Sequence, residues 1–276
     1  MTIIFKAKTT EGYSIKICTE LLQNNIKTAC FEIDKNGIKL RMMDHHRRVL
    51  IDIDLQSENF TLYKFKPSPA EKMFIGVNMT HFHKMVKAIK KKDSMVLFID
   101  DARPTDLGIK VVPKENNRIT TSYIKIQEIQ NLDIDLPTNY GKPVIVPSGE
   151  FQKLCKDMNN IGTTINILSK GFYVKFLCNA GSVYSREVVF GEVDDEDDDE
   201  PDPNVIENEY NEDFDTEQLI RIAKISGLST NMQMFPKQDQ PLLFRSNIGN
   251  IGKISIFIKS KNQIDKENIT IEPETE

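Results

Sequence analysis

Short segments that alternate between apolar and polar residues run along most of this chain. Residues 29–44 alternate on both sides of a "KNG" triplet, which favours a β-hairpin with a tight turn. Because alternation turns one face of a strand toward a core, the pattern predicts antiparallel sheets. Further strand patterns lie at residues 48–55, 95–100, 107–112, 119–126, 164–169, 173–178, 185–190, 241–246 and 253–260.

Four other segments have helical spacing, namely residues 11–23, 80–92, 148–160 and 216–226. At 100° per residue, each segment places its apolar side chains on one face, as an amphipathic helix does. We therefore expect four helices packed on the sheets. Their inward sets are Ile15, Cys18 and Leu22; Phe82, Met85, Val86 and Ile89; Phe151, Leu154, Cys155 and Met158; and Leu219, Ile222 and Ala223.

Similar segments recur at an offset of about 137 residues. Residues 14–22 correspond to 151–159, 37–42 to 173–178 with a shift of one, 83–89 to 220–226, and 95–99 to 232–236. Short amphipathic stretches match by chance, but here the four matches keep one order and one offset. The pattern predicts a tandem duplication of the α+β class, with two similar domains that each hold two helices packed on antiparallel sheets.

The predicted helices carry cations opposite their apolar faces. Charged helix faces are common because they solvate a protein, but a random face mixes both signs. Here Glu20, Asp157 and Glu217 are the acidic exceptions, so the bias indicates a polyanionic ligand. Without interleaved aromatic residues, phosphate contact is favoured over base stacking, and double-stranded DNA would be held without sequence preference. The candidate DNA-binding residues are Lys16, Lys84, Lys87, Lys90, Lys91, Lys153, Lys156, Arg221 and Lys224.

Charge and composition refine this picture. The formal net charge is −5, but residues 194–200 alone carry seven negative charges, so the remainder carries +2. We interpret that run as a solvated loop. Hydrophobic residues make up 39% and charged residues 28%, which is a normal soluble balance. With no long apolar run and no secretory signal pattern, we expect an intracellular protein that does not enter membranes.

The sequence shows no set of residues with the pattern of an enzyme active site or a metal site. The cysteines Cys18, Cys30, Cys155 and Cys178 are widely spaced, contain no CxxC pair, and are expected to be small buried hydrophobes. His45 and His46 are adjacent in a predicted strand, so we expect them to point to opposite sides rather than to share a metal. We predict no catalytic residue, no metal and no cofactor.

Five segments carry a resemblance to a known family. In order and spacing, they resemble the eukaryotic sliding clamp, the proliferating cell nuclear antigen family, and the likeness runs from about residue 3 to residue 260. "PSGEF" and "GVN", each before a helix, are the most specific pieces. The segments are "ACFEIDKNGIKLRMMD" (29–44), "LQSENFTLYKF" (55–65), "GVNMTHFHKMVKAI" (76–89), "PSGEFQKLCKDMNNIG" (147–162) and "PLLFRSNIGNIGKISIFI" (241–258).

The resemblance implies a duplicated DNA-clamp fold in a ring-shaped homotrimer, with the basic helices lining the channel. Such a ring encircles duplex DNA, acts as a polymerase processivity factor and recruits replication and repair proteins. The expected organisation is an N-terminal clamp domain (1–123), a connecting linker (124–142), a C-terminal clamp domain (143–262) with an acidic loop (194–204), and a C-terminal tail (263–276).

The resemblance also implies partners, namely a DNA polymerase, a clamp loader and proteins that carry the family's interaction motif. Arg47 and Arg48 stand where the family has smaller or apolar residues, so partners are expected to carry acidic residues or a modified motif. Lys259 and Ser260 replace an apolar pair of the family. By position, the partner-binding pocket comprises Met43, Arg47, Leu50, Ile134, Leu136, Pro137, Pro241 and Phe257.

Two alternatives remain open. The first is a monomeric processivity subunit with the same fold that does not close a ring, and the second is a nucleic-acid-processing enzyme. Richness in isoleucine, asparagine and lysine points to an AT-rich genome, such as that of a large DNA virus or a protist. The expected location is the nucleus, or a cytoplasmic replication site for a viral protein.

Overall fold

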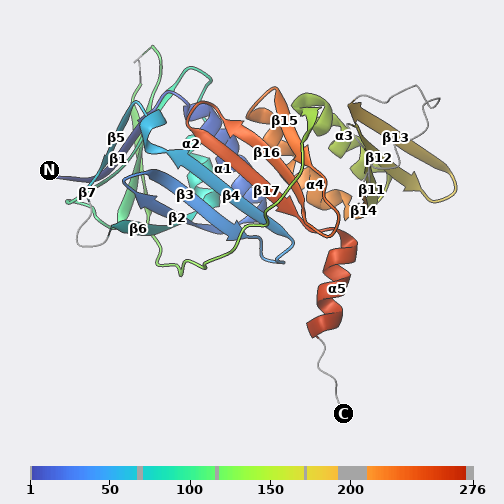
Figure 1. Cartoon of the computed structure of the whole chain (residues 1–276). Coiled ribbons are helices and arrows are strands. Elements are labelled where there is room, and N and C mark those ends of the chain that lie inside the picture. The colour runs from blue at the N-terminus through green and yellow to red at the C-terminus, as the bar shows by residue number, and fades with distance from the viewer. Residues whose placement is uncertain (1, 67–70, 116–117, 171–172, 192–209, 272–276) are drawn as a thin grey trace. The chain divides into compact units, whose positions relative to one another are not determined.

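The computed structural model in Figure 1 describes residues 2–66, 71–115, 118–170, 173–191 and 210–271. The predicted acidic loop, residues 194–204, lies outside these ranges. The chain forms two compact units. Unit 1 comprises Met1–Asp135, Gly227–Ser229 and Ser246–Ile256, and unit 2 comprises Leu136–Ser226, Thr230–Arg245 and Phe257–Glu276.

Unit 1 contains the first strands and helices of the chain. They are β1 (Ile3–Thr9), α1 (Gly12–Asn25), β2 (Thr28–Asp34), β3 (Gly37–Met43), β4 (Val49–Gln56), the 3₁₀ helix η1 (Ser57–Asn59), β5 (Leu62–Phe65), β6 (Lys72–Asn78), α2 (Met79–Val86), β7 (Ser94–Asp100), β8 (Asp106–Val112) and β9 (Thr120–Lys125).

The later elements belong mainly to unit 2, although β16, β17 and the end of η2 also contribute residues to unit 1. They are β10 (Val144–Pro147), α3 (Ser148–Ile161), β11 (Thr164–Lys170), β12 (Tyr173–Ala180), β13 (Tyr184–Gly191), β14 (Tyr210–Asp215), α4 (Thr216–Ile222), the 3₁₀ helix η2 (Ala223–Gly227), β15 (Asn231–Phe235), β16 (Leu242–Ile248), β17 (Gly252–Ile258) and α5 (Lys261–Ile271).

The strand order repeats between the two halves of the chain. Strands β6-β2-β3-β4 are neighbours in one half, and β14-β11-β12-β13 are neighbours in the other. Likewise β1-β7-β8-β9 has its counterpart in β10-β15-β16-β17. Each half also has one helix after its first strand and one between its fifth and sixth repeated strands, since α1 and α2 correspond to α3 and α4. The predicted tandem α+β duplication is therefore confirmed.

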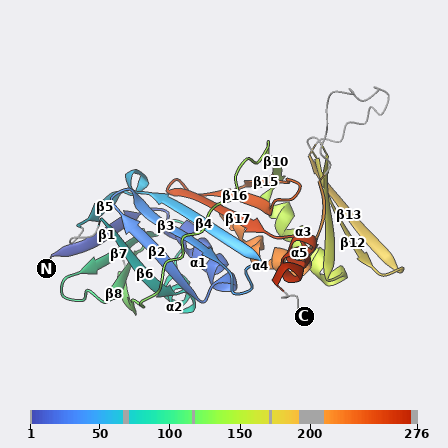
Figure 2. The ribbon, with the colours of Figure 1, turned by 60° about the horizontal axis from the view of Figure 1, so that its bottom comes forward.

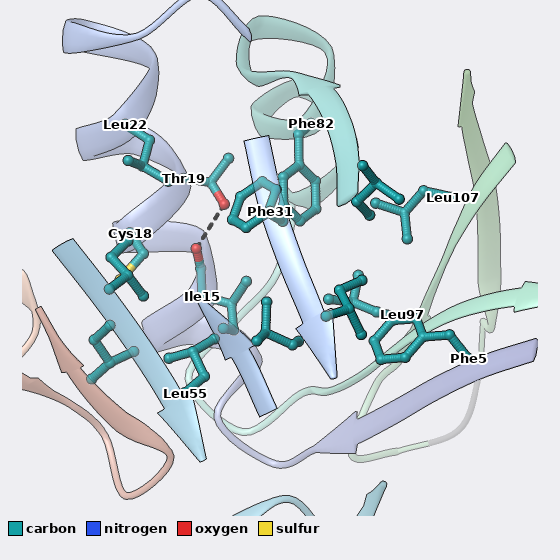
Figure 3. A pocket seen from close by; sticks show the side chains of 15 residues that line it. Phe5, Ile15, Cys18, Thr19, Leu22, Phe31, Leu55, Phe82, Leu97 and Leu107 are labelled. Atoms are coloured by element: carbon teal, nitrogen blue, oxygen red, sulfur yellow. Dashed lines mark hydrogen bonds between the residues drawn. The ribbon is translucent and has the colours of Figure 1, made fainter. Parts of the chain in front are cut away.

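Two helices lie side by side against the strands of unit 1, as Figure 1 shows for α1 and α2. Between them and the sheets is a small apolar cavity of about 50 Å³. In Figure 3, Phe31, Phe82 and Leu22 lie around this space. The hydroxyl of Thr19 donates to the carbonyl of Ile15 at 2.8 Å, so the polar side chain in this lining has its hydrogen-bond partner.

The core of unit 2 is built around aromatic rings from a helix and two strands. Phe151 of α3 is fully buried, and its ring centroid lies 6.3 Å from Phe176 of β12 and 5.2 Å from Phe244 of β16. Leu154, Cys155 and Met158 are buried on the same helix. The predicted inward face of the third helix is thus confirmed, because a 3.6-residue period brings these positions together.

The second predicted helix is shorter than the sequence pattern suggests. α2 ends at Val86 instead of continuing to residue 92. The chain turns instead, because the Asp93 carboxylate accepts the N–H of Lys90 at 2.9 Å and the Asp93 N–H donates to the Lys90 carbonyl at 3.1 Å. Met85, expected to point inward, is 39% exposed, so this assignment was wrong.

Other elements confirm or extend the predictions. All predicted strands are present, but the sequence pattern missed β1, β5, β6, β10, β14 and β15, as well as helix α5. The four cysteines are buried and reduced, as expected. Burial raises the pKa of the Cys18 and Cys155 thiols, which suits a packing role. No helix in the described ranges is long and apolar enough to cross a membrane.

Candidate nucleic-acid interface and partner surface

The face of α2 that points away from the core presents two lysines. Lys84 and Lys87 are exposed, whereas Phe82 and Val86 are buried. The helix begins at Met79 because the Asn78 side chain accepts the His81 N–H at 3.0 Å. Since this cap sets where the helix starts, it also sets the direction in which the two ammonium groups point.

Lys16 of α1 differs from these exposed cations. It is half-buried, and its ammonium donates to the Ile89 carbonyl at 3.2 Å and lies 5.4 Å from the centroid of the Tyr13 ring. The side chain therefore ties α1 to the turn that follows α2. Its positive charge remains on this side of unit 1, but its position is determined by contacts within the protein.

Lys90 and Lys91 are exposed but lie in the turn after α2, not on the helix. Lys91 therefore does not share a helix face with Lys84 and Lys87, as the predicted helix over residues 80–92 implied. The Asp93 hydrogen bonds that close the turn account for this correction. The ammonium of Lys91 lies 5.9 Å from the Tyr13 ring centroid.

In unit 2, α3 and α4 present their predicted cations with more acidic neighbours. Lys153 pairs with Glu150 at 2.7 Å, and this hydrogen bond raises the pKa of the Lys153 ammonium. Arg221 pairs with Glu217 at 2.5 Å. The remaining two predicted cations are Lys156, which is exposed, and Lys224, which is half-buried in η2.

A further cation of unit 2 was missed by the helix plots because it comes from a strand. Arg186 of β13 pairs with Asp157 of α3 at 2.7 Å. Figure 2 shows β12 and β13 side by side, and their register places Arg186 opposite Cys178. Asp157, an acidic exception in the sequence pattern, is therefore paired with a positive charge that only the fold brings near.

Three of the predicted partner residues of unit 1 lie in or beside the turn between β3 and β4. Leu50 is buried, Met43 is half-buried and Arg47 is exposed. The Asp44 carboxylate accepts the N–H groups of Arg48 and Val49 at 2.7 and 2.9 Å. Arg47 adopts φ 56°, a left-handed conformation that is uncommon for a residue with a side chain.

His45 and His46 lie in this same turn rather than in a strand. Their ring centroids are 5.3 Å apart in an edge-to-face arrangement, so the expectation that they point to opposite sides was wrong. The strand β3 ends at Met43, and strand alternation does not extend into the turn. Among the described residues, no group of three or more His, Cys, Asp or Glu side chains could hold a metal ion.

The first half of the predicted linker is attached to unit 1. Arg41 donates through Nη1 to the Ile134 carbonyl at 3.0 Å, and its Nε binds the Asp52 carboxylate at 3.0 Å. Closer to β9, Gly76 and Gln127 exchange backbone hydrogen bonds of 3.0 and 2.8 Å. These contacts hold Ile134, a predicted pocket residue, in place by its backbone.

The second half of the linker is attached to unit 2 through Tyr140. Its hydroxyl donates to the Pro241 carbonyl at 2.7 Å, and its ring centroid lies 6.2 Å from Phe235 and 6.1 Å from Phe257. Burial raises the pKa of this hydroxyl, so it stays protonated and remains a donor at neutral pH. The sequence analysis missed Tyr140, although it named Pro241 and Phe257.

The other predicted residues here are Leu136 and Pro137, both half-buried. Beside them, Lys237 donates to the carbonyl of Asn139 at 2.6 Å. Asn139 has φ 63°, so the chain bends just before Tyr140. Each half of the linker is thus attached to its own unit by side-chain hydrogen bonds to backbone carbonyls.

A duplicated α+β fold whose repeated helices expose cations is typical of the class of DNA polymerase clamps. The model of the N-terminal domain of proliferating cell nuclear antigen matches residues 4–136, and that of the C-terminal domain matches residues 136–262. The chain therefore belongs to the proliferating cell nuclear antigen family, whose members are non-enzymatic processivity factors in DNA replication.

Two relatives cover almost the full length. The chain is 24% identical over 260 residues to a protein of Paramecium bursaria Chlorella virus 1 named probable DNA polymerase sliding clamp 1, with 93% of this chain and 96% of the relative covered. It is also 24% identical over 267 residues to the proliferating cell nuclear antigen of Chaetomium thermophilum, with coverage of 94% and 98%.

Proposed function

We propose that this protein encircles double-stranded DNA as a ring-shaped homotrimer and keeps a DNA polymerase on its template without sequence specificity. The observation that carries this proposal is the repeated helix pair. In each unit, a buried apolar helix face lies opposite exposed cations such as Lys84 and Lys156. A phosphate backbone attracts such cations whatever its base sequence.

The proposed DNA contacts differ in strength between the units. In unit 1, Lys84 and Lys87 are exposed and have no ion pair among the described residues. In unit 2, Lys153 and Arg221 each form an ion pair with a glutamate, which offsets part of their positive charge. We therefore expect unit 1 to supply most of the salt-dependent attraction. The complete proposed set is Lys16, Lys84, Lys87, Lys90, Lys91, Lys153, Lys156, Arg221 and Lys224.

Self-association is supported by two sheet edges. Within the described ranges, β9 pairs along its length with β8 alone and β13 with β12 alone. Tyr123 on β9 is 41% exposed, and Tyr184 on β13 is 54% exposed. Unpaired strand edges with exposed apolar side chains favour pairing with another chain. We propose that β9 of one copy pairs with β13 of the next, which closes the trimer.

Partner recruitment is proposed at the surface beside residues 124–142, the proposed connecting linker between clamp domains 1–123 and 143–262. The expected partners are a DNA polymerase, a clamp loader and replication or repair proteins with the family's interaction motif. The exposed Arg47 favours acidic residues in those motifs. The proposed pocket residues are Met43, Arg47, Leu50, Ile134, Leu136, Pro137, Pro241 and Phe257.

The deciding experiment compares retention on closed circular DNA with retention on the same DNA after linearisation. A ring stays on the circle and slides off free ends, so we expect retention on the circle only. Equal retention on both, or a monomer mass of 31.7 kDa at micromolar concentration, would contradict the ring and favour a monomeric processivity subunit. The protein would act where DNA is replicated, in the nucleus or at a cytoplasmic viral replication site.

A further inference from the structure

An apolar groove bordered by lysines lies on the sheet of unit 1 that contains β5, β1, β7, β8 and β9. It has a volume of about 510 Å³. Leu62, Phe98 and Val112 contribute apolar surface to its floor, and all three side chains are half-buried. Lys8 and Lys110 stand beside this floor. The groove therefore combines apolar surface with positive charge.

The lysine-bordered groove faces away from α1 and α2. Phe5, Leu97 and Leu107 point to the helix side of the sheet, where they line the small apolar cavity in Figure 3. Because successive side chains of a strand alternate between its two faces, Lys6 and Lys8 project from the opposite side. The sheet thus separates the groove from the cations of α2 that are proposed to contact DNA.

The strand register arranges the groove residues in rows across the sheet. Lys8 of β1 lies opposite Val96 of β7, and Val96 lies opposite Lys110 of β8. In the neighbouring row, Lys6 of β1 lies opposite Phe98 of β7. Each row therefore places an apolar side chain of β7 beside at least one lysine.

The lysines of the groove have no acidic partner. Among the described residues, Lys6, Lys8 and Lys110 form no ion pair. Asp100 is the one acidic residue in the described lining, and it is 8% exposed. Its carboxylate accepts the Arg103 N–H at 3.0 Å, so it shapes the turn after β7. The positive charge of the groove is left for a ligand.

Two lysines directly opposite each other make this charge excess unfavourable for the free protein. Lys6 of β1 lies opposite Lys64 of β5, and like charges in such a cross-strand pair destabilise a sheet. Lysine on an edge strand such as β5 opposes unwanted strand pairing, but β1 and β8 are interior strands of this sheet. Edge protection therefore does not account for Lys6, Lys8 and Lys110, whereas an anionic ligand would relieve the repulsion.

We propose that the lysine-bordered groove binds an acidic peptide segment of a partner protein, with its apolar side chains on the floor and its carboxylates at the lysines. Phe98 is the one aromatic residue in the described lining, and its ring packs edge-to-face against Tyr123 at 5.9 Å. The Tyr123 ring is itself covered by the Arg103 guanidinium, 4.4 Å from its centroid. Successive bases of a nucleic acid would therefore lack stacking partners, while an aliphatic floor suits a peptide.

This binding site is independent of the clamp function proposed above. The groove lies within unit 1, so it requires neither DNA nor a second copy of the chain. None of the residues proposed for the partner-binding pocket lines it. A peptide in the groove thus leaves that pocket free for a second partner.

The test measures the affinity of the full chain for a fluorescein-labelled synthetic peptide in which leucines are spaced by aspartates and glutamates, using fluorescence anisotropy. The groove variant carries Lys8→Glu and Lys110→Glu. Its matched control carries Lys35→Glu and Lys253→Glu, two exposed lysines outside the groove that form no ion pair in the described ranges. Urea unfolding verifies that both variants are folded.

We expect the groove variant to bind the peptide about tenfold more weakly than the control variant, because two attractions become two repulsions. Leu62→Ser removes apolar surface from the floor and should weaken binding about fivefold. Polyglutamate of the same length should bind the wild type more weakly than the leucine-containing peptide. Equal affinities of the groove and control variants would overturn the proposal.

Other occupants of the groove give different results. If the groove variant loses binding of oligo(dT) but binds the peptide as the control does, the ligand is a nucleic acid and the proposal is wrong. If the peptide binds only after residues 194–200 are replaced by serine and glycine, the acidic run of the chain itself is the occupant, which also contradicts a partner segment. Retention on circular DNA should be equal for both variants, so a failure of the clamp function is distinguishable.

A crosslinking measurement locates the contact directly. The four native cysteines are buried, so a photocrosslinker can be attached selectively at Lys8→Cys or, as a control, at Lys35→Cys. Crosslinks to the peptide from position 8 and not from position 35 support the proposal. The absence of a crosslink from position 8 would contradict it.

Discussion

Replacing Tyr140 by phenylalanine separates the hydrogen bond of the linker from its aromatic packing. The substitution removes the hydroxyl that donates to the Pro241 carbonyl at 2.7 Å but keeps the ring beside Phe235 and Phe257. A hydrogen bond of this kind contributes about 0.5–1.5 kcal/mol net. Since 1.4 kcal/mol is a factor of about ten, the detached population of this linker end should rise about two- to tenfold.

The alanine variant adds the loss of the ring. Each of its two aromatic contacts contributes about 0.5–1.5 kcal/mol beyond burial, so Tyr140→Ala should destabilise the attached linker by about 3 kcal/mol in total. The detached population should then rise about a hundredfold. Tyr184→Phe is the matched control, because Tyr184 is 54% exposed and its hydroxyl has no hydrogen bond among the described residues.

The assay is limited subtilisin cleavage at residues 136–143, with cut positions read by mass spectrometry. When opening and closing are fast, cleavage tracks the population of the open form. Cleavage should increase in the order wild type, Tyr140→Phe, Tyr140→Ala, while the Tyr184→Phe control matches the wild type. Cleavage near Gln127, which pairs with Gly76 in unit 1, should not change. If Tyr140→Ala is cleaved like the wild type, Tyr140 does not anchor the linker.

Three further substitutions test the packing and the turns. Phe151→Ala should lower the free energy of unfolding by about 3–5 kcal/mol, because Phe151 is fully buried; a change below 1 kcal/mol in urea unfolding would contradict this. Asp93→Ala should cost about 1–3 kcal/mol, since it leaves the Lys90 N–H without its acceptor, and Asp93→Asn should recover part of this loss in thermal melts. Gly252→Ala should cost about 1–3 kcal/mol, because its Cβ would lie 2.0 Å from the Asp54 carbonyl oxygen; a melting temperature equal to that of the wild type would refute the close approach.

Periodicity predicted the fold well where one local rule decides a side chain's direction. The third helix is an example, since Phe151 and Cys155 are buried and Lys156 is exposed, as the 3.6-residue spacing requires. The hairpin of β2 and β3 and the order of the duplicated elements were predictable for the same reason. Strand β6 was missed because a strand with irregular alternation carries a weaker sequence signal, whereas β1 was missed although its residues 5–9 alternate regularly.

Prediction failed where a specific hydrogen bond, either within a turn or between distant residues, decided the outcome. Helix periodicity extended α2 to residue 92, but the Asp93 carboxylate closes the turn onto Lys90. Lys16 has the spacing of an exposed cation, yet it donates to the Ile89 carbonyl, 73 positions away in the chain. A helix plot contains no information on such partners, because they lie outside the helix that is plotted.

The sequence by itself determined the duplicated α+β architecture, the apolar faces of the helices and the excess of cations opposite them. Those features depend on spacing within one element, and burial of apolar surface then enforces them. Only the tertiary structure decided which cations remain unpaired. Arg186 pairs with Asp157, and Lys90 to Lys92 lie near Lys114 and Arg118, only because the strands and turns pack together. The amino-acid type fixes the charge of each residue, but the electrostatic potential at the surface is the sum of contributions from all the neighbours that folding brings together.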